Sequence, residues 1–223
     1  MLYRDRRDAG ERLAARLTGY KDRADVLVLA LPRGGVVTGH EVAHALNCPL
    51  DVLIVRKIGF PGQPELAIGA LSETGAVSLN KRIIESYGID EEYIRSEISR
   101  ERKEVERRAA LYRGDRGIPL LSGKVIILVD DGVATGATIK AAISTLKEEN
   151  LSRLVAALPV ASRKAEREIG QMVDEMVCLS APDDFMAVGN YYRDFRQVSD
   201  DEVIDILRGQ GVTLDSKETG ERA

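Results

Sequence analysis

Short aliphatic runs recur along the chain and alternate with stretches of helical spacing. The runs cover residues 26–31, 50–55, 124–129, 154–158 and 175–179. Near-continuous aliphatic runs are typical of parallel strands that are buried on both faces. Apolar residues recur with the spacing of amphipathic helices over 38–46, 138–149 and 162–171. The pattern predicts an α/β fold built on a parallel sheet.

The segment after the second run departs from this alternation. Residues 58–64 are rich in glycine and proline and predict a mobile loop. Strand-like pieces at 66–71 and 76–79 flank a turn at 72–75, which indicates a hairpin. Residues 81–116 are helical and highly charged, with one apolar stripe: Ile94, Ile98, Val105, Ala109 and Tyr112. We expect a helical insert that packs by this stripe while its other faces remain solvated.

The two ends of the chain predict further, smaller elements. Ala9, Leu13 and Leu17 share one face of a helix over 8–17, which we expect to cover the core. An irregular, aromatic-rich stretch at 180–199 precedes a terminal helix at about 200–207. We interpret residues 1–210 as a single domain and predict that the polar tail 211–223 is disordered.

Composition narrows the class of protein. The chain has 223 residues and a formal net charge of −4, whereas non-specific nucleic-acid binders carry a basic excess. It lacks an apolar run of the roughly 20 residues needed to cross a bilayer, and its N-terminus lacks the apolar centre of a signal peptide. We therefore expect a cytoplasmic protein that binds neither nucleic acid nor membranes. Cys48 and Cys178 stand in apolar surroundings and indicate buried hydrophobic positions.

The strongest chemical signal is the segment VIILVDDGVATGATI at residues 125–139. Asp130 and Asp131 come directly after a strand, at the sheet edge where open α/β folds bind ligands. Two adjacent carboxylates can accept hydrogen bonds from the vicinal hydroxyls of a ribose. Small and hydroxyl residues then open a helix, whose free N–H groups suit a phosphate: Ala134, Thr135, Gly136, Ala137 and Thr138.

This segment resembles the signature of type I phosphoribosyltransferases, which bind 5-phosphoribosyl-1-pyrophosphate (PRPP). The resemblance implies a parallel sheet with helices on both faces, a flexible loop or hairpin, and a small C-terminal hood, here residues 180–199. It also implies that Asp130 and Asp131 hold the ribose and that residues 134–138 hold the 5-phosphate. Mg²⁺ would be bound through PRPP, without a dedicated protein cage. We also expect a homo-oligomer, namely a dimer.

A second match is LPRGG at residues 31–35, between the first strand and the first helix. It resembles the pyrophosphate loop of the family, in which a non-proline cis peptide is common. The Pro32–Arg33 bond holds that position. The resemblance assigns Arg33, Gly34 and Gly35 to pyrophosphate, together with Arg56 and Lys57 after the second strand. Taken alone, these two basic residues could be ordinary surface charges.

A third match is PDDFMAVG at residues 182–189, which resembles the hood of the hypoxanthine-guanine enzymes. It implies that Phe185 stacks on the acceptor base and that Met186 adjoins it. An aromatic face with backbone polar groups suits a base. The competing interpretation makes Phe185 a core residue, because aromatic side chains are commonly packing groups.

The general base is where the resemblance fails. The hypoxanthine-guanine enzymes have an aspartate directly before the Thr-Gly pair, where this chain has Ala134, as the adenine enzymes also have. Glu65 and Glu73 are the remaining candidates, and both could equally be solvated surface carboxylates. The expected activity is transfer of the phosphoribosyl group from PRPP to a nitrogenous base with release of pyrophosphate. Two alternatives stay open: a PRPP-sensing regulator without turnover, and a PRPP-synthesising kinase, for which no separate ATP-binding segment is visible.

Overall fold

Five parallel strands form the centre of the molecule. The computed structural model describes residues 2–114 and 116–209, with only the backbone described at 64–66. The strands are ordered β2-β1-β6-β7-β8, and their bounds are β1 Val26–Ala30, β2 Leu50–Val52, β6 Val125–Val129, β7 Arg153–Val160 and β8 Glu175–Ser180. Each predicted aliphatic run thus overlaps one of these strands, and the parallel sheet is confirmed.

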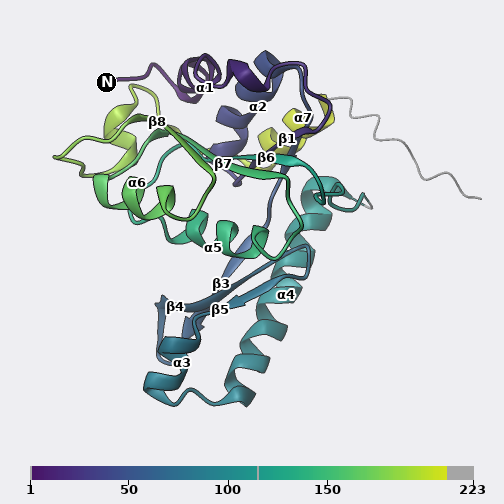
Figure 1. Ribbon diagram of the computed structural model, residues 1–223, viewed down its shortest axis with the longest axis vertical. Coiled ribbons are helices and arrows are strands. Elements are labelled where there is room, and N and C mark those ends of the chain that lie inside the picture. Colours follow the sequence, from purple (N-terminus) through teal and green to yellow (C-terminus); the bar gives the residue numbers. More distant parts are fainter. Residues whose placement is uncertain (1, 115, 210–223) are drawn as a thin grey trace, which may run out of the picture.

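Helices cover both faces of this sheet (Figure 1). One face carries α1 (Arg6–Ala14), α2 (Gly34–Leu46) and α7 (Asp200–Gly209), and the other carries α5 (Ala137–Leu146) and α6 (Arg163–Gly170). Successive residues of a strand point to opposite faces, so β1 sends Val28 into one core cluster and Leu29 into the other. Both residues are fully buried. Burial on both faces is the reason that these strands are apolar throughout.

A second, antiparallel sheet stands beside the first and corrects one prediction. It contains β3 (Val55–Phe60), β4 (Gln63–Ser72) and β5 (Val77–Leu79), in that order. The predicted loop 58–64 is therefore the closed end of the β3–β4 hairpin, where Gly62 turns the chain at φ +74°. Glycine and proline misled the interpretation because they serve the turn and an irregular register around Gly59. The hairpin predicted around residues 72–75 is confirmed as β4–β5.

The helical insert consists of α3 (Lys81–Tyr87) and α4 (Glu91–Arg113). The predicted apolar stripe does face the core, where Ile94, Val105 and Tyr112 are buried. Along its length α4 contacts β3, β4 and α7, so it spans from the small sheet to the helix α7 (Figure 1). The insert therefore packs both on the hairpin and on a helix that covers the central sheet.

A buried ion-pair network anchors the last turn of α4. Arg113 Nε donates to Asp51 Oδ1 at 2.6 Å, and its Nη2 donates to Glu73 Oε1 at 2.8 Å. The Arg113 and Glu73 side chains are only 1% and 5% exposed. Buried charges are tolerated where they are paired and hydrogen-bonded. This network joins β2, the β4–β5 turn and the insert.

The N-terminal segment pairs with the predicted hood. Tyr3 forms a parallel bridge with Tyr192, and Arg193 N donates to the Tyr3 carbonyl at 2.9 Å. The described residues also form two short 3-10 turns, one at Thr18–Tyr20 and one at Val188–Tyr191 within the hood. None of the described helices is both long and apolar enough to span a lipid bilayer. The tail 211–223, predicted to be disordered, lies outside the described residues.

Candidate functional site

The strand order reverses between β1 and β6. From β1 the chain continues outward to β2, whereas from β6 it continues in the opposite direction to β7 and β8. Open α/β sheets usually bind their ligands at such a switch point, outside the carboxyl ends of the two strands. The loops after β1 and β6 start side by side, since Leu31 N donates to the Val129 carbonyl at 2.9 Å.

The loop after β1 carries a cis peptide between Pro32 and Arg33, as the sequence predicted. Helix α2 begins at once, with Arg33 at its N-cap position. Gly34 and Gly35 allow the acidic pair to approach this loop. A Cβ on Gly34 would overlap with Asp131 Oδ2, and a Cβ on Gly35 would lie 3.0 Å from Asp130 Cα. The structure thus brings the predicted acidic pair and the predicted pyrophosphate loop into direct contact.

The two carboxylates of the acidic pair have different surroundings. Asp131 Oδ2 accepts a 2.6 Å hydrogen bond from Arg6 Nε, whereas Asp130 Oδ1 accepts one from the Asp131 N–H at 2.9 Å. Burial raises the pKa of Asp130 well above its usual value, and the neighbouring Asp131 charge raises it further. Burial also raises the pKa of Asp131, against the opposing effect of the Arg6 guanidinium. Arg6 therefore favours the ionised form of the pair.

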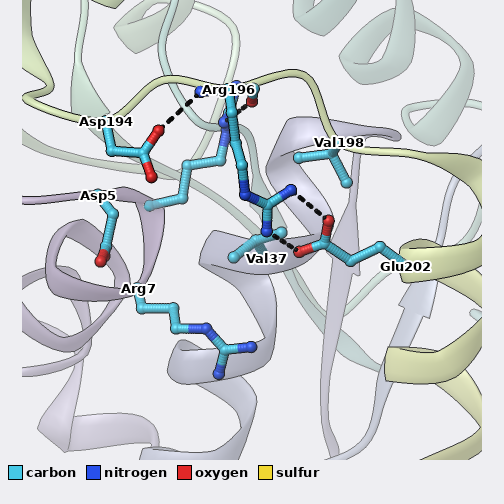
Figure 2. A pocket seen from close by; sticks show the side chains of 8 residues that line it. Asp5, Arg7, Val37, Asp194, Arg196, Val198 and Glu202 are labelled. Atoms are coloured by element: carbon cyan, nitrogen blue, oxygen red, sulfur yellow. Dashed lines mark hydrogen bonds and ion pairs between the residues drawn. The ribbon is translucent and has the colours of Figure 1, made fainter.

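Arg6 is a site residue that sequence reasoning missed. Its Nη1 donates to the Arg196 carbonyl at 2.8 Å, and its guanidinium lies 3.9 Å from the centre of the Phe195 ring. One of several arginines in an N-terminal helix of mixed charge offers no signal for this role. Figure 2 shows the small cavity beside it, about 80 Å³ in volume, where the Arg196 guanidinium pairs with Glu202. The N-terminus, the hood and the acidic pair therefore meet at Arg6.

The loop after β6 leads directly into the N-terminus of α5, where Ala137 N donates to Thr135 Oγ1 at 3.4 Å. Gly136 adopts a left-handed conformation (φ +75°), which a residue with a side chain rarely adopts, and α5 starts at the next residue. Ala134, Thr135 and Thr138 are exposed. Ser162 Oγ stabilises the loop by donating a hydrogen bond to the Ala134 carbonyl at 2.7 Å. Backbone N–H groups at the start of α5 are therefore presented next to the acidic pair.

Arg56 has a different partner from the one that the resemblance implied. It lies in β3, and its Nε donates to Glu101 Oε2 of α4 at 2.6 Å. The chain leaves the central sheet after Val52 and enters the second sheet at Val55, and there Arg56 pairs with the insert. Lys57 follows it in β3, and its side chain is half-buried. The structure does not join Arg56 to the Pro32–Arg33 loop.

The two residues predicted as candidate general bases, Glu73 and Glu65, lie in different parts of the β4–β5 hairpin. Glu73 is held by Arg113, and its Oε1 also accepts from the Ile54 N–H at 2.7 Å. The Glu73 carboxylate is thus buried and hydrogen-bonded within the protein, and a role as general base stays a prediction. Glu65 lies in β4, and its side chain is outside the part of the chain that the structure describes.

The hood packs directly over the residue after the acidic pair. A Cβ on Gly132 would lie 2.5 Å from Val188 Cγ1, so the hood closes on this position. Within the hood, Phe185 stacks on Tyr191 with ring centres 5.4 Å apart. Met186 is 82% exposed. The ring of Phe185 is thus partly packed, and its role toward a base stays a prediction.

Fold and site together define a type I phosphoribosyltransferase fold. A model of the phosphoribosyl transferase domain matches residues 3–196, and the chain belongs to this family. A protein of Mycobacterium tuberculosis H37Rv, named as a phosphoribosyl transferase, is 43% identical over 206 residues, which are 92% of this chain and 46% of that protein. The chain thus spans about half the length of the curated relatives it matches.

A solved structure from Thermus thermophilus, that of TT1426, shares the fold over nearly its whole length. The two chains are 44% identical, with a TM-score of 0.86. The alignment covers 94% of this chain and 99% of the other. The second sheet and the helical insert are therefore part of the fold that this chain shares with a solved relative.

Proposed function

We propose that the protein transfers the 5-phosphoribosyl group from PRPP to a nitrogenous base and releases pyrophosphate. The observation that carries the proposal is the contact between two separate motifs at the carboxyl ends of β1 and β6. The side chain of Asp131 lies so close to Gly34 that only glycine fits, and the loop 134–138 follows the same pair along the chain. PRPP is a ribose with phosphate groups at both ends. It therefore needs a loop for the pyrophosphate, an acidic pair for the ribose and a loop for the 5-phosphate, in this order.

The roles follow from the chemistry of each group. Asp130 and Asp131 would accept hydrogen bonds from the ribose hydroxyls, and the start of α5 would hold the 5-phosphate. The bond between C1 and the pyrophosphate oxygen breaks, and a ring nitrogen of the base forms the new bond to C1. Catalysis would come mainly from positioning and from stabilising charge on the leaving group. Phe185 and Met186 of the hood would adjoin the base.

Magnesium fits this site only in part. The acidic pair offers oxygen ligands that suit Mg²⁺, but Asp131 Oδ2 is already bonded to Arg6. No group of three or more candidate ligands exists among the described residues. Mg²⁺ would therefore take most of its ligands from PRPP and would neutralise the pyrophosphate charge.

A screen for pyrophosphate release tests the proposal. The protein would be incubated with PRPP and Mg²⁺, together with adenine, hypoxanthine, guanine, xanthine, orotate, uracil or nicotinate in turn. We expect release with one class of base and none without a base. Absence of release with every base would contradict the transferase proposal.

A PRPP-sensing regulator is the second candidate, and one observation favours it. Ala134 stands where the resemblance to the hypoxanthine-guanine enzymes would place an aspartate, and Glu73 is hydrogen-bonded to Arg113. PRPP binding without pyrophosphate release would support this candidate. For either function we also propose a cytoplasmic homodimer.

A further inference from the structure

A pocket of about 230 Å³ lies between the Pro32–Arg33 loop, the end of α4 and the start of α7. Its lining contains three arginines and a single carboxylate: Arg33, Arg107, Arg108 and Asp200. Pro32 and Arg33 directly precede α2, so the positive end of that helix adjoins the pocket. A water molecule takes about 30 Å³, so the pocket has room for an anion larger than one phosphate group.

The arginines are not neutralised within the pocket. Arg107 and Arg108 share one carboxylate, Glu104, at 2.8 Å and 2.7 Å. Arg33 lies 4.0 Å from Asp200, whose Oδ1 already accepts a 2.6 Å hydrogen bond from the Tyr112 hydroxyl. Three guanidinium groups therefore face two carboxylates. Guanidinium groups bind phosphate oxygens in a two-pronged geometry, which makes a phosphate-bearing ligand the natural occupant.

We propose that this pocket binds a diphosphate group and that the insert helix α4 supplies Arg107 and Arg108 to it. The inference rests on the proposed function, since Arg33 belongs to the predicted pyrophosphate loop. It also explains the placement of Arg56, which the resemblance assigned to pyrophosphate but which Glu101 holds. In this arrangement the guanidinium groups at the pocket come from the insert helix α4 and not from the basic residues after the second strand.

Titration calorimetry with sodium pyrophosphate and, separately, with PRPP tests the inference at one ionic strength in the presence of Mg²⁺. The test variant is Arg107→Gln with Arg108→Gln. The control is Arg95→Gln, because Arg95 also pairs with a glutamate of α4, at 3.1 Å, but lies about 18 Å along the helix from Arg107. All these side chains except Arg108 are well exposed, so the variants should fold.

We expect the double variant to bind at least one of the two ligands about tenfold more weakly, which corresponds to about 1.4 kcal/mol. Weaker binding of PRPP would assign the pocket to the diphosphate of PRPP, and weaker binding of pyrophosphate alone would assign it to the free anion. The Arg95→Gln control should match the wild type.

Two results would overturn the inference: a double variant that binds both ligands as the wild type does, or a control that loses as much affinity. If the double variant binds both ligands as the wild type does, the inference is contradicted, but PRPP binding still supports the proposed function. If pyrophosphate binds through these arginines and PRPP does not bind at all, the inference is supported and the proposed function is contradicted. A wild type that binds neither ligand would contradict both.

Discussion

Arg6 Nε donates a 2.6 Å hydrogen bond to Asp131 Oδ2, and the two side chains are only 10% and 14% exposed. The contact joins residues 125 positions apart. It ties the N-terminal helix to the acidic pair and, through Phe195 and the Arg196 carbonyl, to the hood. We interpret Arg6 as a positioning residue that keeps Asp131 ionised and oriented.

Replacing Arg6 should therefore make PRPP binding depend on pH. Arg6→Ala removes the charge that opposes the raised pKa of Asp131, so the pair should take up a proton at higher pH than in the wild type. We expect affinity for PRPP to fall about tenfold at pH 6 and less at pH 9, measured by calorimetry. Arg6→Lys should restore most of the affinity. Equal losses at both pH values would show that Arg6 acts only through packing.

The acidic pair should also lower the free energy of unfolding at pH values where both carboxyl groups must ionise. A carboxyl group with a raised folded pKa binds protons more tightly in the native state, so stability falls as pH rises from the usual carboxyl pKa toward the raised value. Asp130→Asn removes this cost and keeps an oxygen for the Asp131 N–H. We expect its melting temperature at pH 8 to rise by about 2–4 °C, equal to roughly 1 kcal/mol for a chain of this size.

Asp131→Asn is the matched comparison for that experiment. It leaves the buried Arg6 guanidinium without its carboxylate, so its melting temperature should fall. The difference between the two variants should shrink at low pH, where the carboxyl groups are protonated. Identical shifts in both variants would argue against an asymmetric pair.

Glycine at position 34 should be essential for the contact between the two motifs. In Gly34→Ala the new Cβ would collide with Asp131 Oδ2, and displacing that carboxylate should destabilise the protein by about 1–3 kcal/mol. Urea denaturation measures the change. Gly19→Ala is the control, because nothing lies within 4 Å of its added Cβ. Wild-type stability in Gly34→Ala would show that the acidic pair does not lie against the loop.

The buried network of α4 should be structural. Arg113→Ala leaves Asp51 and Glu73 without their common cation, and breaking a buried pair typically costs about 3–5 kcal/mol. Thermal unfolding should show this loss, whereas Arg102→Ala on an exposed position of the same helix should be nearly neutral. If Glu73 were instead the general base, Glu73→Gln would change the pH profile of turnover without changing stability.

The sequence predicted those parts of the fold in which local pattern and tertiary position agree. The strands of the central sheet are apolar because both faces are buried, and the loops after β1 and β6 were predicted from residue types in a fixed order. Arg56 was placed differently because the chain leaves the central sheet after Val52 and enters the second sheet at Val55, a change that no local pattern marks. Arg6 was not predicted because its role depends on a contact with Asp131, 125 positions away in the sequence.

The most direct test of the account is the affinity for PRPP of a variant with Asp130→Asn and Asp131→Asn together. Hydrogen bonds to a charged acceptor contribute about 1.5–3 kcal/mol each, so titration calorimetry should show binding at least tenfold weaker than in the wild type. Circular dichroism would verify that the fold is kept. An unchanged dissociation constant in a folded double variant would contradict the assignment of PRPP to the acidic pair.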